Sequence, residues 1–395
     1  MGNDEIPIPA QGVVLLGLGK AAIAMTRAAA DVLRGVPLTG VVATNRPGPV
    51  PAGIEVIVGG HPLPDEGSER GGRRLLEAAR GAGERLVVTL VSGGGSALAE
   101  VPAPGVSLPD LVAVNDALIR SGAPIGEINV VRKHLSAIKG GRLAAAADRG
   151  PMITLVVSDV VGNPLDLIAS GPTVPDPSTY RDALAILAGH RIVPPPAVAR
   201  LLERGGAGEV ADTPSGGELL ARQTIRIVAD GPAAADGACR AARERGIEAK
   251  VSTTSLAGEA RRVGAAIGAE LRVRTREGLT VLAGETTVTV TGDGSGGRNQ
   301  ELALAAGIAL EGDPDGVVLA FGTDGIDGPT TAAGGIGDGT TVARGRGAGR
   351  DAAAALDDND AGGYLEAIGD RVVCGPTGTN VGDLVLAYRS GGSPD

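Results

Sequence analysis

The segment Thr291–Glu301 carries a dense set of groups that could bind a charged ligand. Its sequence, TGDGSGGRNQE, joins four glycines to an arginine, two amides and two acids. The β-rich run Val281–Val290 precedes it and the alanine- and leucine-rich run Leu302–Leu310 follows it, so the predicted order is strand, glycine loop, helix. Backbone amides at a helix start and the planar guanidinium of Arg298 both suit a phosphate or a carboxylate. The segment therefore predicts a site for a negatively charged ligand.

Lys20 is a second candidate cation, in the first turn of a predicted helix (20–33) that follows an apolar strand. Residues 17–22 read GLGKAA, which satisfies the G-x-G-x-x-A pattern of dinucleotide-binding loops. The next strand, however, ends in Asn45 and Arg46 in place of the acid that binds a ribose, which fits at best NADP, and a plain tight turn is the other reading. Because a cation at a helix start opposes the helix dipole, we expect an anion to join Lys20.

Two more regions in the first half of the chain could bind anions. Ser92–Ser96 (SGGGS) follows a predicted strand, and its amides could form an anion nest, with a tight crossover as the alternative. It is not a Walker A loop, because no G-K-[ST] closes it. A long predicted helix, 127–147, carries Arg132 beside Lys133, and it places Lys139 on the face of Arg132. For Lys139 a solvated basic face is an equal reading.

Acidic residues follow two other predicted strands. Asp159 comes after a buried strand and could bind magnesium or a hydroxyl group, or cap a turn. Asp324 and Asp327 lie three residues apart in the loop FGTDGIDG, where carboxylates and water could hold magnesium shared with phosphates; the alternative is an Asx turn. Residues 375–380 (GPTGTN) offer a further phosphate contact before the run 381–388, which we predict as helical.

Composition excludes several classes of function. With one Phe, no Trp and a net charge of −10, the chain lacks both the aromatic residues that stack on single-stranded nucleic acid and a global field that attracts nucleic acid or an anionic membrane. The two cysteines and three histidines show no metal-ligand spacing. The apolar runs are too short for a membrane span, and the first residues do not read as a signal peptide. We therefore predict a cytoplasmic protein with an aliphatic core and neither a nucleic-acid nor a membrane partner.

The order of predicted elements indicates an α/β fold. Strands alternate with helices, with glycine at the joints, which favours parallel sheets covered on both faces. One helix is predicted over 109–120, with Ser107 as its N-cap, and the helix over 127–147 is interrupted at Gly140-Gly141. The proline- and glycine-rich breaks at 194–196 and 213–217 place a domain boundary near residue 220, although one strand could cross it. The predicted domains are 1–220 and 221–395.

Taken together, these loops resemble the class II glycerate 2-kinases, whose second half carries a MOFRL domain. The motifs that carry the resemblance are GLGKAA (17–22), GHPLPDEG (60–67), SGGGSAL (92–98), EINVVRKHLSAIKGGRLA (127–144), SDVVGN (158–163), ASGPTVPD (169–176), GETTVTV (284–290), GGRNQE (296–301), GTDGIDGP (322–329) and GPTGTNVGDL (375–384). The resemblance implies an N-terminal Rossmann-like domain with a mostly parallel sheet and helices on both faces, a C-terminal MOFRL α/β domain, and an active site in the interdomain cleft. It also implies ATP-dependent, Mg²⁺-requiring phosphorylation of D-glycerate at the 2-hydroxyl.

The same resemblance implies a set of site residues. The catalytic residues would be Lys20, Glu285, Arg298 and Asp324. The substrate- or nucleotide-binding residues would be Ser92, Gly93, Gly94, Gly95, Ser96, Arg132, Lys133, Gly296, Gly297, Asn299, Thr377, Gly378, Thr379 and Asn380, and the metal-binding residues Asp159 and Asp327. The chain departs from the pattern at 230–232 (DGP) and at Asp293 and Ser295, which bears on substrate and nucleotide preference. The alternatives are an NAD(P)H-dependent hydroxypyruvate reductase and a non-catalytic sugar-acid-binding protein, and the chain is expected to be a monomer or homodimer.

Overall fold

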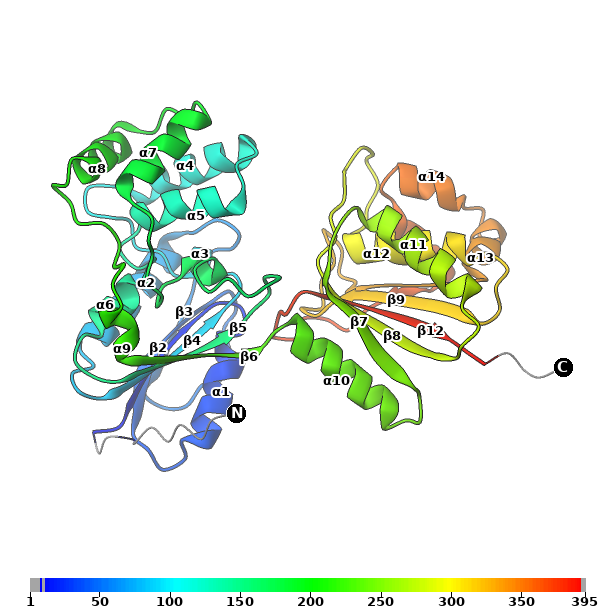
Figure 1. Cartoon of the computed structure of the whole chain (residues 1–395), viewed down its shortest axis with the longest axis horizontal. Helices are drawn as coiled ribbons and strands as arrows, with labels where there is room; N and C mark the ends of the chain where they lie inside the picture. The colour runs from blue at the N-terminus through cyan, green and yellow to red at the C-terminus, as the bar shows by residue number, and fades with distance from the viewer. Residues whose placement is uncertain (1–7, 9–10, 392–395) are drawn as a thin grey trace. The chain divides into compact units, whose positions relative to one another are not determined.

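The computed structural model describes residue 8 and residues 11–391, which form two compact units (Figure 1). The first unit comprises 1–157 and 163–228, and the second comprises 158–162 and 229–395. The predicted boundary near residue 220 lies just before strand β6 (Gln223–Ala229), whereas the division into units falls at the end of that strand. Each unit has its own sheet and its own hydrophobic core.

The first unit has a six-stranded sheet with the order β3-β2-β1-β4-β5-β6. Its other strands are β1 (Val13–Leu18), β2 (Leu38–Thr44), β3 (Ile54–Val58), β4 (Leu86–Ser92) and β5 (Met152–Val157). All pairs from β3 to β5 are parallel. Every residue of β1 and β4 is buried, because helices cover both faces, and this explains their unbroken apolar sequences (Figure 1). The predicted Rossmann-like sheet is confirmed, and its strand order reverses between β1 and β4, where such folds bind ligands.

The helices of the first unit cover both faces of its sheet, and four of them pack around a separate hydrophobic core. The helices are α1 (Ala22–Val32), α2 (Glu66–Arg80), α3 (Gly95–Leu98), α4 (Leu108–Arg120), α5 (Ile125–His134), α6 (Arg142–Ala146), the 3₁₀ turn η1 (Ile168–Ser170), α7 (Tyr180–Gly189), α8 (Pro196–Gly206) and α9 (Glu218–Ala221). Helices α4, α5, α7 and α8 enclose a core with Leu111, Leu135 and Leu202. The predicted N-cap Ser107 is confirmed at the start of α4, where it forms a capping box with Asp110.

The single long helix predicted over 127–147 is wrong. Helix α5 ends at His134, and the chain then runs beside Pro102 before α6 begins at Arg142. Gly140 and Gly141 adopt φ of +56° and +80°, the left-handed region that favours glycine. The helical stretch therefore ends before the two glycines, and Gly141 is the N-cap of α6.

The second unit has a six-stranded sheet with the order β11-β10-β9-β12-β8-β7. The strands are β7 (Ala249–Leu256), β8 (Gly278–Gly284), β9 (Gly316–Gly322), β10 (Gly334–Asp338), β11 (Arg371–Val372) and β12 (Asp383–Arg389). Only β7 and β8 are parallel, and the other pairs are antiparallel, so the expectation of parallel sheets fails here. The predicted helix over 381–388 is also wrong: most of this run forms β12, a central strand between β8 and β9 in which Leu384, Val385 and Ala387 are buried.

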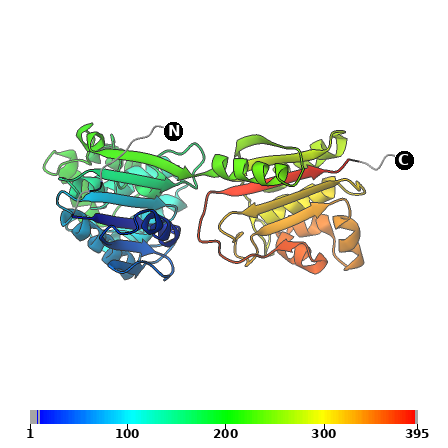
Figure 2. The same ribbon diagram turned by 90° about the horizontal axis from the view of Figure 1, so that it is seen from below.

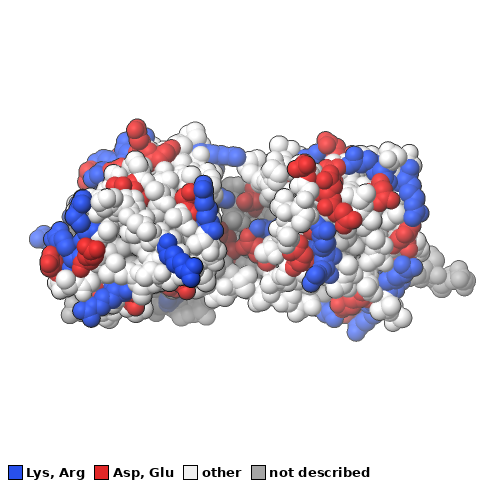
Figure 3. All heavy atoms as spheres, turned by 90° about the horizontal axis from the view of Figure 1, so that it is seen from above, with Lys and Arg blue, Asp and Glu red and all other residues white. Residues whose placement is uncertain are grey.

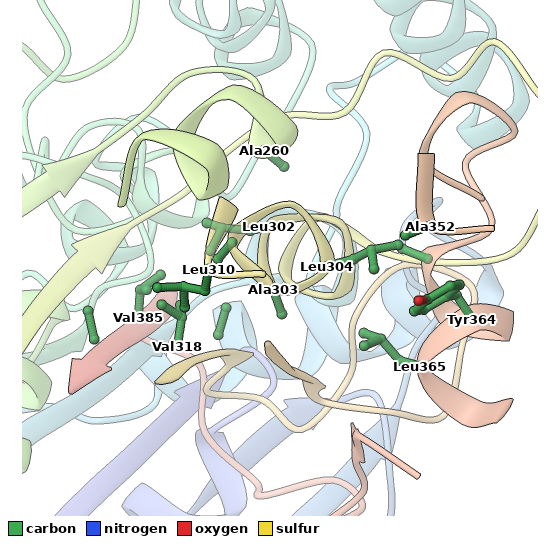
Figure 4. Close-up of a cluster of buried hydrophobic side chains, with 14 of the residues drawn as sticks. Ala260, Leu302, Ala303, Leu304, Leu310, Val318, Ala352, Tyr364, Leu365 and Val385 are labelled. Atoms are coloured by element: carbon green, nitrogen blue, oxygen red, sulfur yellow. The ribbon is translucent and has the colours of Figure 1, made fainter. Parts of the chain in front are cut away.

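Helices cover both faces of the second sheet (Figures 1 and 2). Helix α10 (Gly231–Arg243) packs on one face, and the other face carries α11 (Ala260–Val273), α12 (Arg298–Ala309), α13 (Thr341–Gly347), α14 (Ala352–Asp357) and α15 (Ala361–Ile368). The core between α12 and the sheet is aliphatic, as predicted, with Leu302, Leu310, Val318 and Val385 in contact and Tyr364 at its edge (Figure 4). Helix α12 is thereby fixed against the sheet.

The described part of the chain has no helix that is both long and apolar enough to cross a membrane. On the face shown in Figure 3, acidic and basic side chains are interspersed on each unit.

Candidate active site

Three strands of the second sheet bring their loops to one edge. Asp383, the first residue of β12, pairs with Gly284 at the end of β8 and with Gly322 at the end of β9. Glu285 and the loop of Asp324 follow those two glycines directly. The second unit therefore gathers the predicted catalytic acids at this edge, and the register of the strands sets their spacing.

Arg298, the first residue of α12, is held at this edge by two carboxylates. Its Nε and Nη2 donate to the two oxygens of Asp383 at 2.5 and 3.0 Å, and its Nη1 donates to Oε1 of Glu285 at 2.5 Å. Although burial opposes the charge, the bonds to Asp383 and the negative charges of Asp383 and Glu285 raise the pKa of Arg298 above its ordinary value. The guanidinium is a fixed, permanently charged group.

The environment of Glu285 disfavours its negatively charged form. Burial raises the pKa of Glu285, and the negative charges of Asp383 and Asp159 add to the rise against the opposing charge of Arg298. Asp159 belongs to the same unit and accepts a hydrogen bond from Nδ2 of Asn380 at 3.1 Å. Among the described residues, no cluster of three His, Cys, Asp or Glu side chains is arranged to hold a metal ion.

The glycine loop before Arg298 is a packed structural element and not an open anion cradle. The amides of Thr291 and Gly292 donate to Oδ1 of Asn359 at 2.7 and 2.9 Å, and the amide of Gly294 donates to the carbonyl of Asp358 at 2.8 Å. A Cβ on either glycine would lie 2.4 to 2.5 Å from that carbonyl oxygen, which explains the glycines by close packing. The prediction that these amides bind a ligand is therefore wrong for this part of the loop.

The anion at the start of α12 is supplied by the protein itself. The buried carboxylate of Asp327 accepts from the backbone amides of Asn299 and Gln300 at 3.1 and 2.8 Å, and from both of their side-chain amides. Gly297 lies so close that a Cβ there would be 2.3 Å from Cγ of Asp327. Burial raises the pKa of Asp327 against these bonds. These contacts support a helix-capping role for Asp327 and do not favour the metal role predicted for it, nor ligand binding by Gly297 and Asn299.

We expect Asp327→Ala to destabilise the second unit, because four hydrogen bonds at the buried start of α12 are lost. The free energy of unfolding should fall by about 2 kcal/mol or more, the scale of a lost helix cap with stranded buried donors. Chemical denaturation followed by circular dichroism measures the loss. The matched control is Asp293→Ala, in the same loop but exposed, which should leave the unfolding midpoint unchanged. Equal midpoints for the two variants would contradict the capping role.

The loops of Asp324 and Thr377 pack against each other. The amide of Thr377 donates to the carbonyl of Asp324 at 3.1 Å, and its hydroxyl donates to the carbonyl of Thr323 at 2.6 Å. Gly325 has φ of +85°, and a Cβ there would lie 2.0 Å from the carbonyl oxygen of Gly375. Oδ1 of Asp324 accepts from the amide of Ile326 at 3.1 Å. Two of the loops singled out in the sequence therefore form one structure.

In the first unit, the loops after β1 and β4 dock together beside Lys20. The amide of Lys20 donates to the carbonyl of Gly93, and the amide of Ala21 donates to Oγ of Ser92, both at 3.0 Å. Gly19 has φ of +118°, and a Cβ there would lie 2.3 Å from Oγ of Ser92. The amides that a dinucleotide-binding loop would offer to a pyrophosphate are thus occupied, so the GLGKAA pattern forms a tight turn. By contrast, the amides of Gly93–Ser96 have no acceptor in the part of the chain described.

The Cγ atom of Lys20 and the ring of His61 both lie beside Gly94. A Cβ on Gly94 would meet Cγ of Lys20 at 3.2 Å and Cδ2 of His61 at 3.1 Å. Burial lowers the pKa of His61, and the charge of Lys20 lowers it further. Nearby, Oγ of Ser96 lies 2.8 Å from Oγ of Ser170, which has the unusual φ of +60°. Non-glycine residues with such φ values are held by their surroundings and often mark functional sites.

The three basic residues predicted near 132–139 have different environments. Lys133 is buried, with its Nζ 3.4 Å from Asp176 and 3.3 Å from Asp166, so these contacts favour a structural role over ligand binding. Lys139 is buried in an ion pair with Glu100, so the reading as a solvated face is wrong. Arg132 lines a pocket.

Sequence reasoning missed three residues of these sites: Asp383, Glu100 and His61. Each lies in or beside a motif that was noted, but no role was given to it. The available signal for Asp383 was an acid that follows glycine and begins an apolar run, VGDLVLAY.

The chain is similar to known protein families, to curated proteins and to a solved structure. Residues 3–203 match a family described as a domain of unknown function (DUF4147), and residues 278–383 match the MOFRL family. A D-glycerate 2-kinase of Thermotoga maritima is 42% identical over 95% of this chain and 90% of its own length. A protein of Agrobacterium vitis named putative hydroxypyruvate reductase is 43% identical over 94% and 86%. The crystal structure of a glycerate kinase from T. maritima matches with a TM-score of 0.88 and 42% identity, over 96% of this chain and 92% of that one.

Proposed function

This chain belongs to the glycerate kinase family that carries a MOFRL domain, and from that premise we infer that it is a glycerate 2-kinase. It transfers the γ-phosphoryl group of ATP to the 2-hydroxyl of D-glycerate, giving 2-phospho-D-glycerate and ADP. The observation that carries this function is the similarity to a D-glycerate 2-kinase along nearly the whole chain. The acceptor of the phosphoryl group is thus an alcohol on a small acid.

A coupled assay tests the function directly. The protein is incubated with D-glycerate, ATP and magnesium; ADP is measured, and the product is identified as 2- or 3-phosphoglycerate. We expect ADP and 2-phosphoglycerate in equal amounts. Oxidation of NADPH with hydroxypyruvate is the parallel control, and activity in that reaction alone would favour the reductase. Binding of D-glycerate without turnover would favour the non-catalytic alternative.

The reductase reading has little physical support in this chain. The amides of Lys20 and Ala21, which would face a pyrophosphate, bond to Gly93 and Ser92. The strand β2 is followed by Asn45 and Arg46, so no acid stands where a ribose would be bound. The G-x-G-x-x-A pattern, Arg46 and the name of the A. vitis relative are the observations in its favour.

We propose the catalytic roles from the charge of each side chain and from how rigidly its contacts hold it. Phosphoryl transfer needs cations around the moving group and a positioned acceptor hydroxyl more than it needs covalent chemistry. Lys20 and Arg298 stabilise the transferring phosphoryl group, and Asp324 orients or deprotonates the 2-hydroxyl. The rigid pairing of Arg298 with Asp383 supports its role, because a fixed donor loses little entropy when it meets the phosphoryl. Lys20 belongs to the first unit, and Arg298 and Asp324 belong to the second.

Nucleotide binding is proposed for two loops. Among the described residues, the amides of Gly93, Gly94, Gly95 and Ser96 have no backbone acceptor, as in a phosphate nest, and Ser92 stands at the start of this loop. Thr377, Gly378, Thr379 and Asn380 lie in the loop that packs on the segment of Asp324.

Cytoplasmic location and a monomeric or homodimeric state stay predictions.

Magnesium fits a pair of acids in the second unit. Burial raises the pKa of Glu285, and the negative charges of Asp383 and Asp159 raise it further, so a cation near Glu285 would relieve this repulsion. Magnesium is usually held by one or two carboxylates, with water and substrate phosphates completing its shell, so a cluster of three acids is not required. We propose that Glu285 and Asp159 hold it, where it would neutralise charge on the phosphates.

The raised pKa of Glu285 predicts an acid limb in the pH profile. A carboxyl group whose pKa lies above the ordinary value of about 4.3 still carries its proton at a mildly acidic pH. A protonated Glu285 is a poor hydrogen-bond acceptor for Arg298 and a poor ligand for a cation. We therefore expect kcat/KM to fall as pH is lowered through the pKa of Glu285. Glu285→Gln should lower kcat/KM at neutral pH and abolish this limb, and Asp293→Asn should leave it in place. The same acid limb in the Gln variant would exclude Glu285 as its source.

A further inference from the structure

A pocket of about 290 Å³ opens in the first unit beside Lys20. His61, Gly94 and Ser96 line one part of it, and Glu100, Asn115 and Arg132 line another. Pockets for drug-sized ligands span about 300–1,000 Å³, so this one lies at the small end and suits a ligand of few atoms. All of its lining residues belong to the first unit.

The acid in this pocket is already neutralised. Glu100 is 1% exposed, and its Oε2 is paired with Nζ of Lys139, which is also 1% exposed. Its Oε1 accepts from Oγ of Ser136 at 2.6 Å and from the amide of Val101 at 3.0 Å. Glu100 and Lys139 are thus a closed pair of one negative and one positive charge.

Arg132 is the charged lining residue of the pocket that forms no ion pair among the described residues. Its Nε donates to Oδ1 of Asn115 at 3.1 Å, a neutral acceptor. Among the described residues, no carboxylate forms an ion pair with this guanidinium, so the Nη groups are available to a ligand. A partly desolvated guanidinium is costly unless it is paired, and burial lowers the pKa of Arg132 accordingly. An anion in the pocket would remove this cost.

We propose that this pocket is the acceptor subsite and that Arg132 binds the carboxylate of the small 2-hydroxy acid. The planar fork of Arg132 matches a carboxylate in shape, and Asn115 orients it through Nε. The 2-hydroxyl lies one carbon from the carboxylate, so a bound acid would keep that hydroxyl near Gly94, where the stem of Lys20 lies. Arg132 would then make the enzyme prefer acids to neutral polyols. The identity of the acid rests on the proposed function, but the charge and size of the ligand do not.

Binding without nucleotide tests the subsite independently of turnover. Calorimetry with the full chain measures the Kd of D-glycerate for the wild type, Arg132→Gln, Arg132→Lys and the control Arg120→Gln, whose arginine is exposed and paired with Asp116. We expect Arg132→Gln to weaken binding by about 10- to 100-fold, the range for a lost hydrogen bond to a charged group. Arg132→Lys should be intermediate, and Arg120→Gln should match the wild type. Glyceramide, the neutral amide of the acid, should bind weakly to the wild type and equally weakly to Arg132→Gln.

Steady-state kinetics separates this subsite from a nucleotide site. In the coupled assay, Arg132→Gln should raise the KM of D-glycerate and leave the KM of ATP unchanged. Asn115→Leu, which keeps the guanidinium but removes its orienting acceptor, should raise the KM of D-glycerate less. The proposal is overturned if Arg132→Gln binds D-glycerate as tightly as the wild type, if the wild type does not bind D-glycerate, or if only the KM of ATP changes. An enzyme that binds D-glycerate through Arg132 without transferring phosphate would overturn the proposed function and retain the subsite.

Discussion

Arg298→Gln is expected to lower kcat by a factor of about 10³ or more, the scale reported for fixed donors and arginines that stabilise transition-state charge. Glutamine cannot replace the guanidinium, which reaches Asp383 and Glu285 at the same time. The KM of D-glycerate should change much less, because the lost interaction is strongest in the transition state. Steady-state kinetics with both substrates measures the two effects.

The same change should also destabilise the fold, since the side chain of Asp383 is only 4% exposed and would keep a buried charge without its partner. We expect a loss of about 3 kcal/mol from the second unit, in line with breaking a buried ion pair from one side. The double variant Arg298→Gln/Asp383→Asn removes that unpaired charge and should recover stability without recovering kcat. Recovery of kcat in the double variant would show that Arg298 acts only by neutralising Asp383.

Lys20→Met is expected to lower kcat by about 10²-fold or more, because one cation next to the phosphoryl group is lost while the apolar stem beside Gly94 is kept. The melting temperature should change less than the activity, since the substitution keeps the amide of Lys20, which joins the loops after β1 and β4.

Lys133→Met is the matched comparison for Lys20→Met, with the same chemical change. Lys133 is buried between Asp166 and Asp176, so its loss should lower the melting temperature clearly. Thermal unfolding followed by circular dichroism, together with the kinase assay, distinguishes the two. A stable but inactive Lys133→Met protein would restore the ligand-binding role that the sequence predicts for Lys133.

The sequence predicts the first sheet well, because β1 and β4 are buried on both faces and therefore apolar at every position. It fails for β12, because a buried central strand and a buried helix share the same apolar composition, and only its partners β8 and β9 distinguish them. Periodicity likewise cannot show that Gly140 and Gly141 turn to positive φ. Pairing and backbone dihedrals are properties of the folded chain.

The candidate site shows a similar division. The position of Arg298 at a helix start is consistent with the order of elements expected from sequence, whereas the packing of the Asp324 loop on the Thr377 loop is seen only in the structure. The use of each glycine is not readable from composition: Gly292 and Gly294 serve close packing, whereas the amides of Gly93–Ser96 have no acceptor among the described residues. The role of Asp383 could not be predicted from local sequence, because its partner Arg298 lies 85 positions away in the chain.

The carboxylate of Asp327 at the start of α12 has a consequence for how a ligand would meet Arg298. The four hydrogen bonds to Asp327 order the first turn of the helix without any external phosphate. Arg298 is therefore preorganised, and a ligand that reaches it loses no binding free energy to local folding. An empty enzyme and a loaded one should then show the same amide hydrogen exchange at this turn.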